Sequence, residues 1–449
     1  MATTDHDVSG DEQPGAAVAV AGEPVPEVDG AEHLARGTAS PELLADTLGE
    51  YFGLWLKRVR SGESGALPVI AGLILLGAYF QIREPAFLSA TNIANLMAQA
   101  GWIITIAMAQ VFVLLLGEID LSVAYNAAIG GTVTIWMVSV HHPFPTWLAI
   151  IVGLLVSAAI ASIEGLLVVW LKIPSFIVTL AGLLGLNGVL IWLFDEAGQV
   201  GNGGVISSHN GFINALTGGN LSPAAGWIIL VVALVLGGAY MIWRDRRRRA
   251  NNLAAPPLSV TLLKLGLMAA VGAVLVAVLN VNRGSAFTAL EGVPWVVPIV
   301  LVLLGGSALL LTRTKFGRYL YAIGGNAEAA RRAGINLSRV RVLAFMLAGL
   351  FAGATGILYT SLLGSMSNDF QGGEFVLYSV AGAVIGGVSL FGGRGRMLGA
   401  VLGGFVVAVI YNGVDLLGLG AAGQYIWTAL VLLAAVTLDA LARRGARTP

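Results

Sequence analysis

The chain has 449 residues, of which 57% are hydrophobic and only 11% are charged, and its mean hydropathy is +0.83. These values exclude an ordinary soluble globular protein and predict many membrane spans. The absence of cysteine excludes disulfides and thiolate chemistry, and the net charge is zero because 25 basic residues balance 25 acidic residues.

The N-terminal 50 residues are acidic, with eleven Asp and Glu residues and one basic residue, Arg36. They lack the basic start and apolar core of a cleaved signal peptide. Since such a composition cannot bury enough apolar surface to fold alone, residues 1–40 are predicted to be a disordered acidic cytoplasmic tail. Residues 41–60 are predicted to form an amphipathic helix that lies on the membrane surface.

Apolar runs long enough to cross the roughly 30 Å hydrocarbon layer recur between residues 67 and 441. They predict an all-α polytopic membrane protein. The twelve predicted spans are 67–81, 98–116, 121–140, 147–170, 174–194, 224–243, 262–280, 293–312, 342–363, 376–391, 397–416 and 422–441.

The distribution of basic residues sets the orientation of these spans. With the N-terminus in the cytoplasm, 22 of the 24 Lys and Arg residues after position 50 fall on the cytoplasmic side. The exceptions are Arg83 and Arg283. The positive-inside rule therefore favours two cytoplasmic termini, the second being a basic tail at 442–449.

Acidic and polar residues within or beside the spans are candidates for a substrate path, because a charge in the bilayer usually faces a cavity or a partner. Glu118 and Asp120 lie in the motif GEIDLSV, whose composition predicts a helix break. That break either lines the path or is a solvated cytoplasmic turn. Buried amides either bind substrate hydroxyl groups or only join helices. The substrate-path candidates are Glu118, Asp120, Ser122, Asn126, Asn187, Glu374, Tyr378 and Asn412.

An internal similarity relates GEIDLSVAYNAAIGG at 117–131 to GEFVLYSVAGAVIGG at 373–387, which match at seven of fifteen positions. In the predicted topology the two copies begin on opposite faces, as the inverted repeats of transporters do. Coincidence is the alternative, since the chain is rich in Gly and Ala.

A basic loop at 313–341 lies between two long spans and holds seven Lys and Arg residues. Within it, Asn326 is the predicted N-cap of a short helix, and Glu328 complements the dipole in the first turn. Two arginines suit the last turn, and Gly334 is the expected left-handed stop. A stiff helix of about 10 Å at the membrane surface suits a part that another protein pushes.

Several function classes lack support. No G-x-x-x-x-G-K-[ST] motif is present, so the chain is not expected to hold ATP as a P-loop protein does. His141 and His142 are interpreted as a surface pair without further metal ligands nearby. Nucleic-acid binding is unsupported, because the basic residues follow the positive-inside pattern.

Four segments resemble the membrane permease subunits of ribose/xylose/galactose-type ABC sugar importers, with similarity from about residue 85 to the C-terminus. An additional pair of predicted spans around the basic sequence WRDRRRR (Trp243–Arg249) makes the xylose-type permeases the most similar group. The segments are GEIDLSV (117–123), IPSFIVTLAGLL (173–184), TKFGRYLYAIGGNAEAARRAGIN (314–336) and VIGGVSLFGGRGRMLGAVLGG (384–404).

This resemblance implies a homodimeric permease in the bacterial cytoplasmic membrane, fed by an extracytoplasmic sugar-binding protein and driven by a separate ATPase subunit. It implies that the chain is a translocation subunit and no enzyme, and that ATP and Mg belong to the partner ATPase. A cytoplasmic coupling helix would dock on that ATPase. The matching residues are Gly324, Gly325, Asn326, Glu328, Arg331, Arg332 and Gly334.

The sequence departs from the family pattern at Glu118, where relatives carry Gly, and at Val376, where they carry an acidic residue. The resemblance implies a monosaccharide substrate, a pentose such as xylose. The alternative is a secondary sugar transporter driven by an ion gradient, in which Glu118, Asp120 and Glu374 bind the coupling ion. A membrane scaffold without transport is a third interpretation.

Overall fold

The computed structural model describes residues 47–60, 67–139, 144–198, 204–251, 253, 255–285, 289–420, 422–430, 433 and 437. Residues 1–46 and 438–449, which include both predicted tails, lie outside them. The helices are α2 (Leu48–Arg60), α3 (Leu67–Arg83), α4 (Ala90–Leu114), α5 (Val123–Met137), α6 (Thr146–Leu171), α7 (Ser175–Glu196), α8 (Gly211–Gly218), α9 (Pro223–Ala250), α10 (Leu258–Leu279), α11 (Val296–Arg313), α12 (Lys315–Gly325), α13 (Ala327–Arg332), α14 (Leu337–Leu363), α15 (Gly372–Ile385) and α16 (Met397–Leu416). The strands are β1 (Val205–Ser207) and β2 (Ser365–Ser367).

The prediction of an all-α membrane fold is confirmed. Among the described residues, eight helices are long and apolar enough to cross a membrane, and they are α4, α6, α7, α9, α10, α11, α14 and α16. α3 and α15 are apolar but shorter, and α5 has only 15 residues. The last predicted span, 422–441, lies largely outside the described residues.

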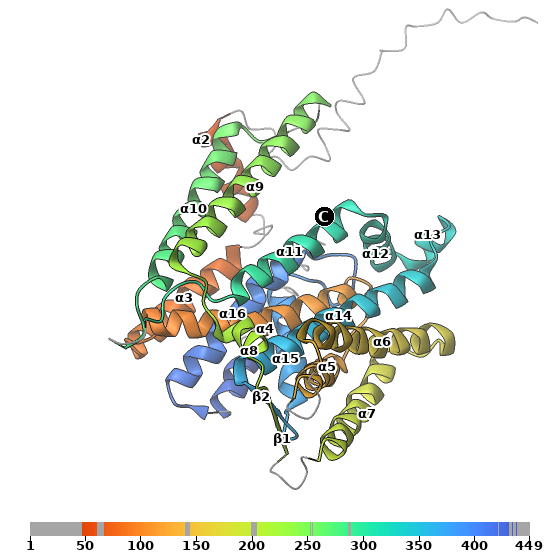
Figure 1. Ribbon diagram of the computed structural model, residues 1–449. Helices are drawn as coiled ribbons and strands as arrows, with labels where there is room; N and C mark the ends of the chain where they lie inside the picture. The colour runs from red at the N-terminus through yellow and green to blue at the C-terminus, as the bar shows by residue number, and fades with distance from the viewer. Residues whose placement is uncertain are drawn as a thin grey trace, which may run out of the picture.

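α4 is the central helix of the bundle, in contact with α14, α15 and α16. Of its most apolar 18-residue window, 83% is buried in the protein, compared with 11% for α9 and α10. α9 and α10 pack against each other, and α10 also contacts α2, at the edge of the bundle (Figure 1). The additional helix pair therefore lies outside the core that α4 organises.

α4 begins eight residues before its predicted start at residue 98, because its polar first turns are satisfied within the fold. Ser89 Oγ accepts a hydrogen bond from the N–H of Asn92 at 3.2 Å and caps the helix. The Asn92 amide pairs with the amide of Asn412 on α16 at 2.8 and 2.9 Å. Polar residues that interrupt the apolar run in sequence are thus buried partners in the bundle.

A two-stranded antiparallel ribbon closes one end of the bundle. β1 pairs with β2 in the register Val205↔Ser367, Ile206↔Met366 and Ser207↔Ser365. α8 packs beside it on α14, where Thr217 Oγ1 donates to the carbonyl of Leu358 at 2.9 Å. The ribbon fixes the segment that follows α14.

Glycines set the distance between α5 and α14, as is common where small residues meet in membrane helix pairs. A Cβ on Gly356 would overlap the backbone carbonyl of Ala127, and one on Gly131 would contact the backbone of Gly356. The two helix backbones therefore touch at this crossing, and any side chain there must separate them.

We expect Gly356→Ala to lower the free energy of unfolding of the purified protein by about 1–3 kcal/mol, because the methyl group overpacks this backbone contact. The control is Gly185→Ala on α7, where a Cβ meets nothing within 4 Å. That substitution should be neutral or stabilise the helix by up to about 1 kcal/mol. Thermal unfolding in detergent, followed by intrinsic fluorescence, measures both. Equal midpoints for the two variants would show that the helices are not in backbone contact.

Candidate functional site

The short helix α13 forms as the sequence predicts. Asn326 Oδ1 accepts a hydrogen bond from the N–H of Ala329 at 2.9 Å, so Asn326 is the N-cap. Gly334 has φ +80°, the left-handed conformation expected of a helix stop. The helix has six residues, one fewer than the roughly seven that its predicted length of about 10 Å implies at about 1.5 Å per residue.

α13 presents its charged side chains outward. Glu328 forms ion pairs with Arg331 at 3.4 Å and with Arg332 at 3.3 Å. These side chains are 56%, 69% and 80% exposed, so the pairs contribute little to stability. Ala330 on the inner face is buried. The charged surface is therefore free of the bundle's own packing.

Four glycines join α13 and α12 to the bundle, and we call Gly117, Gly324, Gly392 and Gly393 the glycine junction. The N–H of Gly393 donates to the carbonyl of Leu115, just after α4, at 2.9 Å. A Cβ on Gly324 would overlap that same carbonyl, and one on Gly392 would contact the backbone of Gly117 and Gly324.

The junction demands glycine for a second reason, which is backbone conformation. Gly117, Gly392 and Gly393 have φ of +78°, +83° and +70°, where other residues are strained. Three segments that are far apart in sequence, after α4, at the end of α12 and before α16, thus meet in direct backbone contact.

α12, which lies between α11 and α13, is not among the helices predicted from the sequence. Thr314 caps it by accepting from the N–H of Gly317 at 3.2 Å. The Tyr321 hydroxyl donates to the carbonyl of Gly395 at 2.8 Å, which ties the helix to the segment before α16. Leu320 and Ile323 are buried, and their spacing with Phe316 is the helical signal that would have revealed it.

Both carboxyl groups of the GEIDLSV turn are buried, so the interpretation as a turn with two solvated carboxylates is wrong. Glu118 is 9% exposed and Asp120 is 1% exposed. Glu118 Oε1 lies 2.8 Å from Arg341 Nε on α14. Burial raises the pKa of the Glu118 carboxyl, and the Arg341 charge opposes that rise. The turn thereby anchors the N-terminal part of α14 to the end of α4.

Ser122 connects two buried carboxyls beside this turn. Its Oγ lies 2.6 Å from Asp120 Oδ1 and 2.7 Å from Glu164 Oε2 on α6. A serine hydroxyl has one proton, so both contacts are hydrogen bonds only when one carboxyl is protonated. Burial raises the pKa of Asp120, and hydrogen bonds from Ser122 and Val123 oppose that rise.

Of the three predicted substrate-path residues with amide side chains, two join helices and the third lies away from the cavity described below. Asn126 Nδ2 donates to the carbonyl of Ser157 at 3.1 Å, which links α5 to α6. Asn412 Nδ2 donates to Asn92 and to Gln99 Oε1, which links α16 to α4. Asn187 is half-buried on α7 and lines none of the cavities described below. The role of all three in a substrate path stays a prediction.

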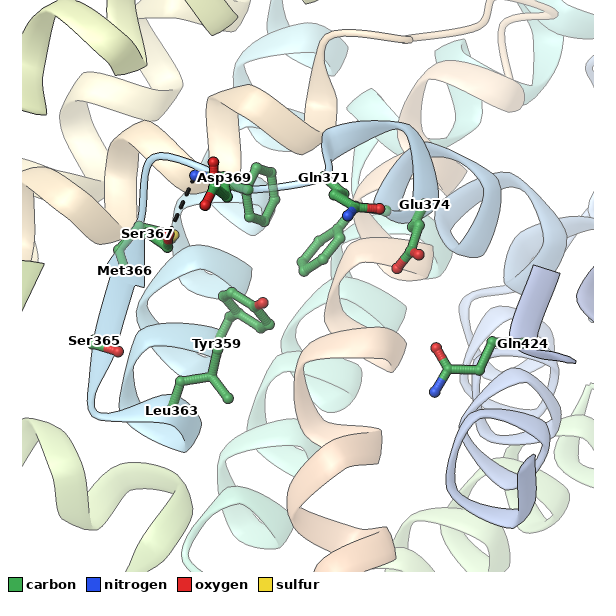
Figure 2. A pocket seen from close by; sticks show the side chains of 11 residues that line it. Tyr359, Leu363, Ser365, Met366, Ser367, Asp369, Gln371, Glu374 and Gln424 are labelled. Atoms are coloured by element: carbon green, nitrogen blue, oxygen red, sulfur yellow. Dashed lines mark hydrogen bonds between the residues drawn. The ribbon is translucent and has the colours of Figure 1, made fainter. Parts of the chain in front are cut away.

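A cavity of about 330 Å³, which we call the distal pocket, lies at the opposite end of α14 from α13. α14 has 27 residues, and at about 1.5 Å per residue the two sites are roughly 40 Å apart. In Figure 2, Glu374 on α15 and Gln424 lie on one side of the pocket, and Ser365, Met366 and Ser367 lie on the other. The lining is Tyr359, Leu363, Ser365, Met366, Ser367, Asp369, Phe370, Gln371, Glu374, Phe375 and Gln424.

Stacked aromatic rings form the floor of this pocket. Trp102, from the middle of α4, stacks on Phe375 with ring centroids 4.2 Å apart and planes inclined by 23°. Its ring also lies 5.4 Å from that of Tyr359, and 6.0 Å from those of Tyr378 and Tyr411. We call these five residues the aromatic cluster. Of them, the sequence analysis named only Tyr378.

The combination of polar walls and an aromatic floor has a chemical meaning. Asp369, Glu374, Gln371 and Gln424 supply acceptors and amide donors, whereas Tyr359 and Phe375 supply flat apolar faces. Pockets of this size, with few polar groups over apolar surface, hold small molecules. The pocket suits a small solute with several hydroxyl groups and apolar ring faces. Glu374 is the predicted substrate-path residue that lines it.

Comparison with known proteins places the chain among permeases. A family model described as branched-chain amino acid transport system / permease component matches residues 92–438. The xylose transport system permease protein XylH of Escherichia coli (strain K12) is 34% identical over 406 residues, which cover 90% of this chain and 97% of that protein. No solved structure matches the chain.

Permeases with other named sugars are also similar. The ribose import permease protein RbsC of Bacillus subtilis (strain 168) is 31% identical over 85% of this chain and 95% of its own length. The D-allose transport system permease protein AlsC of Escherichia coli (strain K12) is 27% identical over 82% of this chain and 89% of its own length.

Two adjacent glycines provide a direct test of the junction. Gly324→Ala should loosen the loop that carries α13, because its methyl group would overlap Leu115, whereas a Cβ on Gly325 meets nothing within 4 Å. Overpacking of this kind costs about 1–3 kcal/mol. We therefore expect trypsin to cut after Arg331 and Arg332 roughly tenfold faster in Gly324→Ala than in wild type. Gly325→Ala is the control and should resemble wild type. Equal cleavage of all three proteins would contradict the junction.

Proposed function

The chain belongs to the family of branched-chain amino acid transport system / permease components, and we propose that it is the membrane subunit of an ABC importer for a pentose such as xylose. The observation that carries this proposal is the 34% identity to a xylose permease over 97% of that protein. The chain is a translocation subunit in the membrane and not an enzyme. ATP and Mg would belong to a separate ATPase subunit.

The exposed charges of α13 support an ATPase as its cytoplasmic partner. Glu328, Arg331 and Arg332 form a compact charged surface on a capped helix, which can transmit a push without bending. The other proposed partners are an extracytoplasmic sugar-binding protein, which would deliver the pentose to the distal pocket, and a second copy of the chain.

We further propose twelve spans with both termini in the cytoplasm. Four contacts between loops support this topology, because each joins two loops that are predicted to lie on the same side of the membrane. β1 pairs with β2 on the proposed outer side, and Asn220 forms a bridge with Pro294 there. Glu118 pairs with Arg341, and Gly393 with Leu115, on the proposed inner side.

The inverted repeat remains a hypothesis. The short helices α5 and α15 would enter the membrane from opposite sides, as the repeat requires. However, Gly130 and Gly131 lie within α5, whereas their counterparts Gly386 and Gly387 follow the end of α15. The aligned glycines therefore occupy different structural positions.

The proposed transport cycle is rigid-body gating. Closure of the ATPase would displace α13, and the glycine junction would pass that displacement to the inner ends of α4 and α16. Since α4 and α15 form the floor of the distal pocket, their movement would open a path below it. No covalent step is needed in this chain.

Reconstituted vesicles test the energy source. With an ATPase subunit and a binding protein, we expect xylose uptake that follows ATP and persists when ion gradients are collapsed. Uptake should disappear when the ATPase is omitted. Uptake by this chain alone on an ion gradient, abolished by Glu374→Gln, would establish the secondary transporter instead.

Two serines test the topology, since the natural chain has no cysteine. Ser207 at the end of β1 and Ser338 at the start of α14 are both exposed, and cysteine is nearly isosteric with serine. A membrane-impermeant maleimide should label Ser207→Cys in intact cells and Ser338→Cys only in inverted vesicles. Labelling of both from the same side would exclude the proposed placement of Ser207 and Ser338 on opposite sides of the membrane.

A further inference from the structure

Trp102 is a deeply buried residue with a polar group close to the distal pocket. It lies at the midpoint of α4 and is 1% exposed, and its Nε1–H has no hydrogen-bond partner among the described residues. Aromatic rings surround it, with Phe375 stacked on one face and Tyr359 and Tyr411 edge-on. A strong donor is therefore enclosed where no acceptor meets it.

An unpaired buried donor is costly, and most buried indole N–H groups find a partner. Packing alone does not require it, because a phenyl ring would fill an apolar site without that cost. The presence of an unpaired N–H donor in this conformation is explained if the donor finds its acceptor in another conformation of the protein. In a transporter, the bound substrate is present in some conformations and absent in others, so it can supply this acceptor.

Phe375 stands between Trp102 and the pocket. Its ring lines the cavity on one side and stacks on the indole on the other. It lies near the start of α15 and also packs edge-on against Tyr359 and Phe370, at 4.8 and 4.5 Å. Removal of this one ring from the stack would expose the indole face to the pocket.

We propose that Trp102 is a sugar-binding, specificity-determining residue and that Phe375 is the lid that covers it in this conformation. When α15 moves, the pentose takes the place of Phe375 and contacts the indole, and one of its hydroxyl oxygens accepts the Nε1–H at the edge of the ring, near the indole plane. This inference rests on the proposed function as a sugar permease and assigns the residue that reads the sugar.

The test is uptake by the complete transporter with Trp102→Phe, which keeps an aromatic face and removes the donor. Losing one hydrogen bond to the substrate should raise the KM for xylose roughly three- to tenfold, with little loss of protein from the membrane. The matched control is Trp170→Phe on α6, a tryptophan that is 79% exposed on the outside of the bundle. Its KM should equal that of wild type.

Deoxy sugars identify the hydroxyl and separate recognition from a general structural effect. Wild type should discriminate against the one monodeoxy-xylose that lacks the accepting hydroxyl. Trp102→Phe should lose this discrimination and keep its discrimination against the other monodeoxy sugars. A Trp102→Phe transporter with unchanged KM and an unchanged deoxy-sugar profile would overturn the inference, although the chain remained a sugar permease. If wild type takes up no sugar, the proposed function itself fails.

A measurement on the unmodified chain covers the case in which the variant does not reach the membrane. A diazirine-bearing xylose, photolysed during turnover, should label the peptide that contains Trp102, and excess xylose should prevent this. Labelling restricted to the pocket rim, with the Trp102 peptide unlabelled, would overturn the inference.

Discussion

The structure depends on a backbone contact that only glycine allows. At the junction, Gly324 abuts the carbonyl of Leu115, and Gly393 donates to that same carbonyl at 2.9 Å. No flexible side chain intervenes, so a displacement of the loop that carries α13 must move the segments it touches. Packed backbone transmits displacement because protein interiors are nearly incompressible. This contact is the physical basis for coupling in the proposed cycle.

The same helices that meet at the junction carry the aromatic floor of the distal pocket. α4 ends beside Leu115 and bears Trp102 at its midpoint, while the loop with Gly392 and Gly393 joins α15, which bears Phe375, to α16. A single movement at the glycine junction therefore reaches both partners of the stacked pair. The two sites, roughly 40 Å apart along α14, are joined by continuous rigid elements rather than by a chain of surface contacts.

The sequence predicted what is encoded locally and missed what arises from contacts between distant segments. Apolar length and capping residues were sufficient for the long helices and for α13, where Asn326 and Gly334 have the predicted roles. The early start of α4 was missed because Asn92 looks unfavourable until its partner Asn412 is known, 320 residues away. Trp102 and the contacts of the junction were missed for the same reason: Gly324 was named as a coupling residue, but nothing local shows that it touches Leu115 or that Trp102 differs from ordinary apolar packing.

The most direct test of this account is a distance across the distal pocket during the ATPase cycle. Spin labels at Ser365→Cys and Gln424→Cys, on opposite walls, would report it by pulsed electron paramagnetic resonance in the complete transporter. The account predicts a nucleotide-dependent change in that distance that survives Gly185→Ala, where a Cβ meets nothing within 4 Å, and disappears with Gly324→Ala. An unchanged response in Gly324→Ala would show that the glycine junction does not connect the ATPase to the pocket.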